Sequence, residues 1–131
     1  MSDFRIIVTG GRKRESSFDY EILDNAIWVL DHTASLTGYP VIIQGGCPDG
    51  ADLLAREIAK EWEFAVETVP ADFDAHPDDA VEVSNQAMLD RGADMCLAFP
   101  DSDGPSLGTW DMIRRACAAG IETRIYPEGK R

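Results

Sequence analysis

Short apolar segments alternate with segments of helical periodicity along the whole chain, and this alternation limits the possible folds more than any other feature. The first apolar segment, residues 4–9 (FRIIVT), is rich in β-branched residues and ends at two glycines, as a buried strand does where it enters a loop. In residues 20–34, apolar side chains recur at the spacing of an amphipathic helix. The same pattern predicts further strands over residues 41–44, 65–69, 95–99 and 121–126, and further helices over residues 51–64, 79–90 and from about 107 onwards.

This order of elements predicts an α/β fold. Continuous apolar strands that alternate with amphipathic helices form a parallel sheet with helices on both faces, because each crossover between parallel strands is right-handed and carries a helix. We therefore expect one doubly wound, Rossmann-like domain over residues 1–131, with five strands in the order 3-2-1-4-5. In such a sheet, ligands bind in a crevice outside the carboxyl ends of the strands, here between strands one and four.

The balance of charge argues against some classes of function. The chain carries 24 acidic and 12 basic side chains and a formal net charge of -12, so its long-range field repels nucleic acids and anionic membrane surfaces. No apolar run approaches the ~20 residues that span a bilayer, and no signal-peptide pattern is present. We expect a cytoplasmic protein that binds neither extended nucleic acid nor membranes. A small anionic ligand is compatible with this charge if the few cations are concentrated at one place.

The cysteines do not indicate a metal site. Cys47, Cys96 and Cys117 are odd in number, widely spaced and without a CxxC pair, which favours reduced thiols in a reducing compartment. We expect neither a bound metal nor a cofactor.

Three glycine-containing loops follow strands one, two and four, and the predicted topology brings them to one edge of the sheet. The first loop also carries three consecutive cations, residues 12–14. The loop after strand four combines glycines and hydroxyls with the start of a helix, whose unpaired N–H groups and partial positive charge favour a phosphate. The predicted ligand-binding residues of these loops are Gly10, Gly11, Arg12, Lys13, Gly45, Gly46, Pro100, Ser106, Gly108 and Thr109.

Each of these residues has a structural alternative. The alternative for the glycines is an ordinary turn, and the alternative for Arg12 is a solvated loop arginine, although its planar guanidinium suits a phosphate. Ser106 is typical of a simple helix cap. Phe73 and Trp110 are candidates for stacking on a base, and Trp110 alternatively covers the edge of its helix.

Two carboxylates and a histidine are candidates for acid–base or ligand-binding roles. Asp52 and Asp111 both fall in a predicted first helical turn, where a carboxylate is stabilised whatever its function. Asp52 is expected chiefly to brace its own loop. His76 follows strand three on the same edge of the sheet, and its ordinary pKa suits proton transfer, with a structural hydrogen bond as the alternative.

Several motifs carry a resemblance to a known family. VTGGR at residues 8–12, GGCPDGAD at 45–52 and VPADFDAH at 69–76 are followed by NQAML at 85–89 and by LAFPD and GTWDMIRRACAAGI. Together they resemble the small YspA-like branch of the SLOG superfamily, which is related to DprA and to the Lonely Guy enzymes. The resemblance implies a Rossmann-like fold that binds a nucleotide or nucleotide-derived, ADP-ribose-like ligand, and it places Asn85 in the site. Because relatives of this fold often dimerise through helices on the sheet faces, we expect a homodimer.

The chain also departs from that family. Where the family usually carries a lysine and two arginines around the asparagine, this chain has Asp78, Ser84 and Gln86. After GGR, an aspartate and an aromatic residue are replaced by Lys13 and Arg14. Cations thus move from the third helix to the first loop, which puts the ligand of the family in doubt for this chain.

The resemblance also bears on catalysis. Aligned on the glycine-threonine motif, the catalytic glutamate of the Lonely Guy enzymes falls on Met112, whose thioether cannot act as acid, base or nucleophile. This favours a sensor, carrier or sequestering module. The alternative is a nucleoside-monophosphate N-glycosidase or related hydrolase, with Asp111, Asp52 or Asp49 as the acid–base group and Arg12 holding the phosphate. A scaffold with a vestigial crevice is the third hypothesis.

Overall fold

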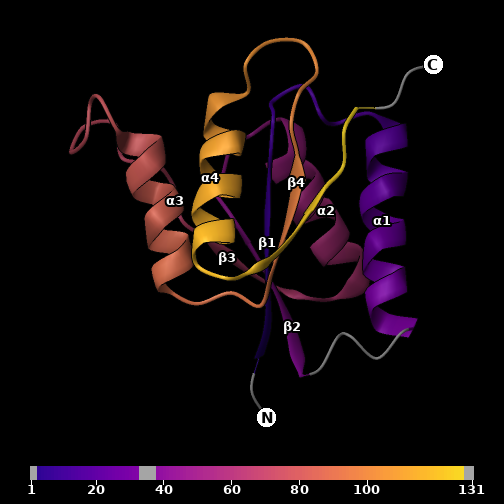
Figure 1. The fold of residues 1–131 in the computed structure, drawn as a ribbon. Helices are drawn as coiled ribbons and strands as arrows, with labels where there is room; N and C mark the ends of the chain where they lie inside the picture. The colour runs from indigo at the N-terminus through magenta and orange to yellow at the C-terminus, as the bar shows by residue number, and fades with distance from the viewer. Residues whose placement is uncertain (1–2, 33–37, 129–131) are drawn as a thin grey trace.

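The computed structural model describes residues 3–32 and 38–128. Five strands form one sheet in the order β3-β2-β1-β4-β5, and every neighbouring pair is parallel, so the predicted fold class and strand order are confirmed (Figure 1). The strands are β1 (Asp3–Gly10), β2 (Tyr39–Gln44), β3 (Ala65–Thr68), β4 (Met95–Phe99) and β5 (Glu122–Ile125), and the helices are α1 (Ser17–His32), α2 (Gly50–Trp62), α3 (Ala80–Asp90) and α4 (Leu107–Ala118).

The helices cover the two faces of the sheet in pairs, α1 with α2 on one face and α3 with α4 on the other (Figure 1). Successive residues of β1 point to opposite faces. Ile6 and Val8 belong to the core under α1 and α2, whereas Ile7 belongs to the core under α3 and α4. Because both faces are covered, β4 is apolar and buried along its whole length.

Two helix ends differ from the predicted positions by two residues or more, for local reasons. α1 begins at Ser17, earlier than expected, because Asp19 N donates to Ser16 Oγ (3.1 Å) while Ser16 N donates to Asp19 Oδ2 (3.4 Å), a reciprocal cap. The predicted end of this helix at residue 34 lies outside the described residues. α2 ends at Trp62 because Glu63 adopts a left-handed conformation with φ of 59°.

The strands begin and end within two residues of their predicted positions. Tyr39 and Pro40, which precede the predicted second strand, already belong to β2 and pair in register with Asp3 and Phe4 of β1. None of the helices in the described part of the chain has the length and hydropathy of a membrane span.

Candidate functional site

A crevice with a volume of about 520 Å³ opens at the carboxyl ends of the strands. Its size is typical of a site for a small molecule. The crevice lies at the edge of the sheet where we predicted the glycine-containing loops to meet. The lining residues are Val8, Thr9, Gly10, Gly11, Arg12, Gly45, Gly46, Cys47, Pro48, Asp52, Pro70, Ala71, Phe73, Val81, Ser84, Asn85, Met88, Asp101, Ser106, Leu107, Gly108 and Thr109.

The three cations between β1 and α1 have three different surroundings. Arg12 is exposed and lines the crevice. Lys13 is exposed but outside the lining, and its Nζ forms an ion pair with Asp103 Oδ2 (2.9 Å). Arg14 is fully buried. Only the first of the three is placed to meet a ligand, whereas the sequence led us to expect all three at the mouth of the crevice.

Arg14 anchors its loop to the sheet. Its Nε donates to Asp19 Oδ1 (3.0 Å), and its Nη1 donates to the carbonyl oxygens of Pro100 (2.7 Å) and Tyr126 (2.8 Å). The guanidinium carbon also lies 5.3 Å from the centre of the Phe99 ring. The loop that carries Arg12 is therefore fixed to the end of β4 and to the segment after β5. Pro100, a predicted ligand-binding residue, contributes a carbonyl to this anchor and is not part of the lining.

Gly10 and Gly11 allow the same loop to lie directly against its neighbours. A Cβ on Gly10 would lie 2.6 Å from the Cβ of Ala51 and 2.6 Å from the carbonyl oxygen of Phe99. A Cβ on Gly11 would lie 2.0 Å from the carboxyl group of Asp101. Both glycines also line the crevice, so the same two residues pack closely against their neighbours and form part of the crevice wall.

The amino terminus of α2 is occupied by the protein itself. Gly50 N donates to Glu15 Oε2 (3.2 Å), and Ala51 N donates to the carbonyl oxygen of Gly11 (3.2 Å). Asp49, at the N-cap position, makes no side-chain cap hydrogen bond. These contacts use N–H groups that would otherwise attract an anion.

The amino terminus of α4 has no such cap. Ser106 holds the N-cap position in a left-handed conformation (φ 47°), and its side chain makes no cap hydrogen bond. Its hydroxyl instead accepts from Asp101 N (3.1 Å) and donates to Thr109 Oγ1 (3.2 Å). The first turn of α4, which includes Gly108, therefore lines the crevice with N–H groups that lack intrahelical partners. Such a turn favours an anion.

Asp52 braces the loop after β2, as expected, and also lines the crevice. Its Oδ2 accepts a hydrogen bond from Cys47 N (3.0 Å). Burial raises the pKa of the Asp52 carboxyl, against the hydrogen bond from Cys47 and the positive charge of Arg56. Gly45 and Gly46 belong to the same loop and line the crevice.

Asp101 is a charged residue of the lining that the sequence did not single out. Burial raises the pKa of its carboxyl, and the negative charge of Glu128 adds to the effect. Its Oδ1 is buried and has no hydrogen-bond partner among the described residues. The available signal was its position two residues beyond strand four, next to the topological switch point where ligands bind.

Asp111 connects α3 to α4 and lies outside the crevice lining. Its Oδ2 accepts from Arg115 Nε (2.8 Å) and from Asn85 Nδ2 (3.0 Å). Partial burial raises the pKa of the Asp111 carboxyl, but these hydrogen bonds and the positive charge of Arg115 outweigh it, so the pKa lies below its ordinary value of 3.8. Asn85 lines the crevice and also donates to the carbonyl oxygen of Gly108 (3.1 Å). Met112 is fully buried.

The segment between β3 and α3 carries two predicted site residues, and only one of them lines the crevice. His76 lies outside the lining, with its Nδ1 3.9 Å from Asp79 Oδ1. Phe73 lines the crevice and is 57% exposed, whereas Trp110 is not part of the lining. Leu107, at the start of α4, lines the crevice and is 71% exposed, more than any other large apolar side chain in the described part of the chain. Nothing in the sequence beyond its position at the helix start marks Leu107.

The cysteines have different environments and are all free thiols. Cys47 lines the crevice, Cys117 is exposed, and burial raises the pKa of the Cys96 thiol to about 12. Within residues 3–32 and 38–128, no cluster of three or more histidine, cysteine, aspartate or glutamate side chains is arranged to hold a metal ion.

Comparison with known proteins gives three findings. A sequence model of the YspA, cpYpsA-related SLOG family matches residues 4–76, which include the loops after β1 and β2. The Gene 61 protein of Mycobacterium phage D29 is 30% identical over 127 residues, covering 89% of this chain and 91% of that protein. The C-terminal domain of a hydrogenase from Pyrococcus furiosus superposes with a TM-score of 0.48 at 16% identity, covering 94% of this chain and 91% of the other.

Proposed function

The chain belongs to the YspA, cpYpsA-related SLOG family, and from that premise we propose that its crevice binds a nucleotide or nucleotide-derived small molecule as a sensor, carrier or sequestering module. The observation that carries the proposal is the uncapped first turn of α4, which lines the same crevice as Arg12. A backbone anion site and a planar cation within one cavity are suited to a phosphate.

The rest of the lining supplies an apolar region suited to the base. Phe73 and Leu107 line the crevice and are largely exposed, and Val81 and Met88 of α3 also line it. Large exposed apolar side chains in a cavity gain free energy when a planar ring covers them, and a phenyl ring also offers a stacking face. In the proposed complex the phosphate lies against α4 and Arg12, and the base contacts Phe73 and Leu107.

The phosphate contact is tested by calorimetry with Arg12→Gln, and Lys13→Gln is the matched control, because Lys13 loses the same charge outside the lining. We expect Arg12→Gln to weaken the binding of a nucleotide about tenfold or more, corresponding to a charge-assisted contact of about 1.5–3 kcal/mol. The free nucleoside, which has no phosphate, should bind both variants as it binds the wild type. Absence of binding by every nucleotide at millimolar concentration would refute the proposal.

The base contact is tested with Phe73→Ala against Tyr39→Ala, an aromatic residue that is 53% exposed at the start of β2. Phe73→Ala should weaken nucleotide and free nucleoside equally, because the stacked base is common to both. Tyr39→Ala should change neither affinity. If Phe73→Ala weakens only the phosphorylated ligand, the proposed orientation is reversed.

A hydrolase is the second candidate, and the environment of Asp52 is the observation that favours it. A carboxyl group with a raised pKa in a ligand-sized crevice is suited to proton transfer. Asp111 is less suited to that role, because its lowered pKa favours the ionised form and it lies outside the lining. Chromatography of the free base released from nucleotides tests this candidate. Turnover that survives Asp52→Asn would assign the chemistry to another group.

A further inference from the structure

We infer that the crevice selects a nucleoside that carries a single phosphate over nucleoside diphosphates, triphosphates and ADP-ribose. This inference rests on the proposed function and names the ligand class of the same site. It follows from the number and sign of the charges that line the cavity and from the number of backbone N–H sites open to an anion.

Among the residues that the structure describes, three charged side chains line the crevice: Arg12, Asp52 and Asp101. The lining therefore combines one cation with two carboxylates, and the cation is exposed. A phosphate that contacts both Arg12 and the first turn of α4 uses the whole of this favourable charge. A second phosphate on the same ligand would find two carboxylates in place of another cation.

The neighbouring cations do not supply the missing charge. Lys13 is paired with Asp103 outside the lining. Arg14 is buried against Asp19. The guanidinium of Arg56 is also outside the lining, and its Nη1 donates to the side chain of Gln44 (2.9 Å).

The backbone N–H groups at the start of α4 can bind an anion, whereas those at the start of α2 are already used. The first turn of α4 is uncapped, but the corresponding turn of α2 is closed by the Glu15 carboxylate and the Gly11 carbonyl. Both groups that close it are negative or partly negative, so this end of the crevice repels a phosphate. The formal net charge of -12 adds a long-range contribution of the same sign.

Asp101 is the residue that enforces the limit. Its carboxyl group lies against Gly11, and its own N–H is tied to Ser106 at the start of α4, so the carboxylate sits beside the proposed phosphate position. Two like charges about 4–8 Å apart near a protein surface repel by a few kcal/mol before screening. For a single phosphate, the contacts with Arg12 and the first turn of α4 offset the repulsion from Asp101. A second phosphate would meet the same carboxylate without a cation of its own.

The test measures affinities for mono-, di- and triphosphates of each common base and for ADP-ribose, at about pH 8 so that the carboxylates are ionised. Titrations are run once with a chelator and once with Mg²⁺. We expect the monophosphate to bind at least about tenfold more tightly than its diphosphate in both buffers. A diphosphate, triphosphate or ADP-ribose that binds as tightly as the monophosphate in either buffer would overturn the inference and leave the proposed function intact. If no nucleotide binds, both fall together.

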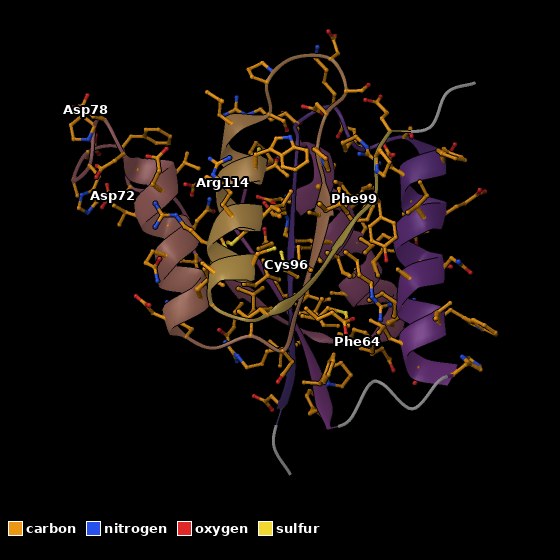
Figure 2. The ribbon with its side chains drawn as sticks, in the orientation of Figure 1. Phe64, Asp72, Asp78, Cys96, Phe99 and Arg114 are labelled. Atoms are coloured by element: carbon orange, nitrogen blue, oxygen red, sulfur yellow. The ribbon has the colours of Figure 1, made fainter. Side chains whose placement is uncertain are left out.

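Asp101→Asn provides the mutational arm. It removes the charge and keeps the shape, and we expect the preference for the monophosphate to shrink several-fold because diphosphate binding improves. The control is Asp78→Asn, which changes the net charge equally at an exposed position on the segment between β3 and α3, outside the lining (Figure 2). An unchanged preference in Asp101→Asn, or an equal change in Asp78→Asn, would contradict the role assigned to Asp101.

Discussion

The buried pair of Arg14 and Asp19 gives the sharpest test of how the first loop is held. Both side chains are almost completely buried, at 0% and 2% exposed, and Arg14 Nη2 is already without a hydrogen-bond partner among the described residues. Asp19→Asn keeps the shape of the side chain and an oxygen that can cap α1, but it removes the negative charge. The guanidinium would then be buried without a compensating anion.

Breaking a buried ion pair from one side costs about 3–5 kcal/mol, because the remaining charge stays out of water. With an entropy of unfolding of about 2.1 cal/mol/K per residue, this loss lowers the Tm of a chain of this length by about 10–20 °C. Glu21→Gln is the matched control, since it makes the same carboxylate-to-amide change at an exposed position of the same helix. We expect its stability to stay within about 0.5 kcal/mol of the wild type.

The assay is chemical denaturation followed by circular dichroism, with scanning calorimetry for the Tm. A loss below about 1 kcal/mol in Asp19→Asn would refute the reasoning, because it would mean that water or a rearranged donor compensates Arg14. Hydrogen exchange of the loop between β1 and α1 adds a local measurement. If the pair anchors that loop, its amides should lose protection in Asp19→Asn and keep it in Glu21→Gln.

Three further predictions concern other parts of the molecule. Glu67→Gln should lower the free energy of unfolding by about 1 kcal/mol at pH 7. Hydrogen bonds from Arg5 lower the pKa of the Glu67 carboxyl below 4.5, so this stabilisation is present above pH 4.5 and is lost as the pH falls. The denaturation curves of variant and wild type should therefore converge in acid. Alkylation followed by mass spectrometry should show Cys47 protected by bound nucleotide and Cys117 labelled regardless; equal labelling of Cys47 would place the ligand elsewhere. Gly10→Ala should destabilise by about 1–3 kcal/mol through overpacking, and the double variant with Ala51→Gly should recover part of the loss in the same denaturation assay.

Local patterns in the sequence were sufficient for the fold and for the edge of the sheet that carries the crevice. Apolar runs such as residues 4–9 report strand burial directly, and the alternation with helices leaves one common topology, so the order of strands could be predicted. The glycines after β1 and β2 follow from the same argument, because every loop after a parallel strand emerges at one edge. These features depend on the order of neighbouring residues in the chain, so they can be predicted from the sequence.

The roles of individual charges depended on residues far away in the chain. Arg12, Lys13 and Arg14 are equivalent in sequence, yet one lines the crevice, one pairs with Asp103 on the loop after β4, and one is buried by contacts with residues as distant as Tyr126. The environment of each cation depends on which residues pack around it, and these residues come from distant parts of the chain.

The same reason separates the two helix starts at the crevice. Both α2 and α4 begin after a glycine-containing loop at this edge of the sheet, but the sequence singled out only the start of α4 as an anion site. Tertiary contacts closed the first, because the carboxylate of Glu15 and the carbonyl of Gly11 reach it across the sheet edge, and left the second open. The sequence alone determined where a ligand site could form, through burial and topology. Only the tertiary structure decided which cations and N–H groups remain unpaired, because hydrogen bonds and ion pairs form between groups that folding brings together.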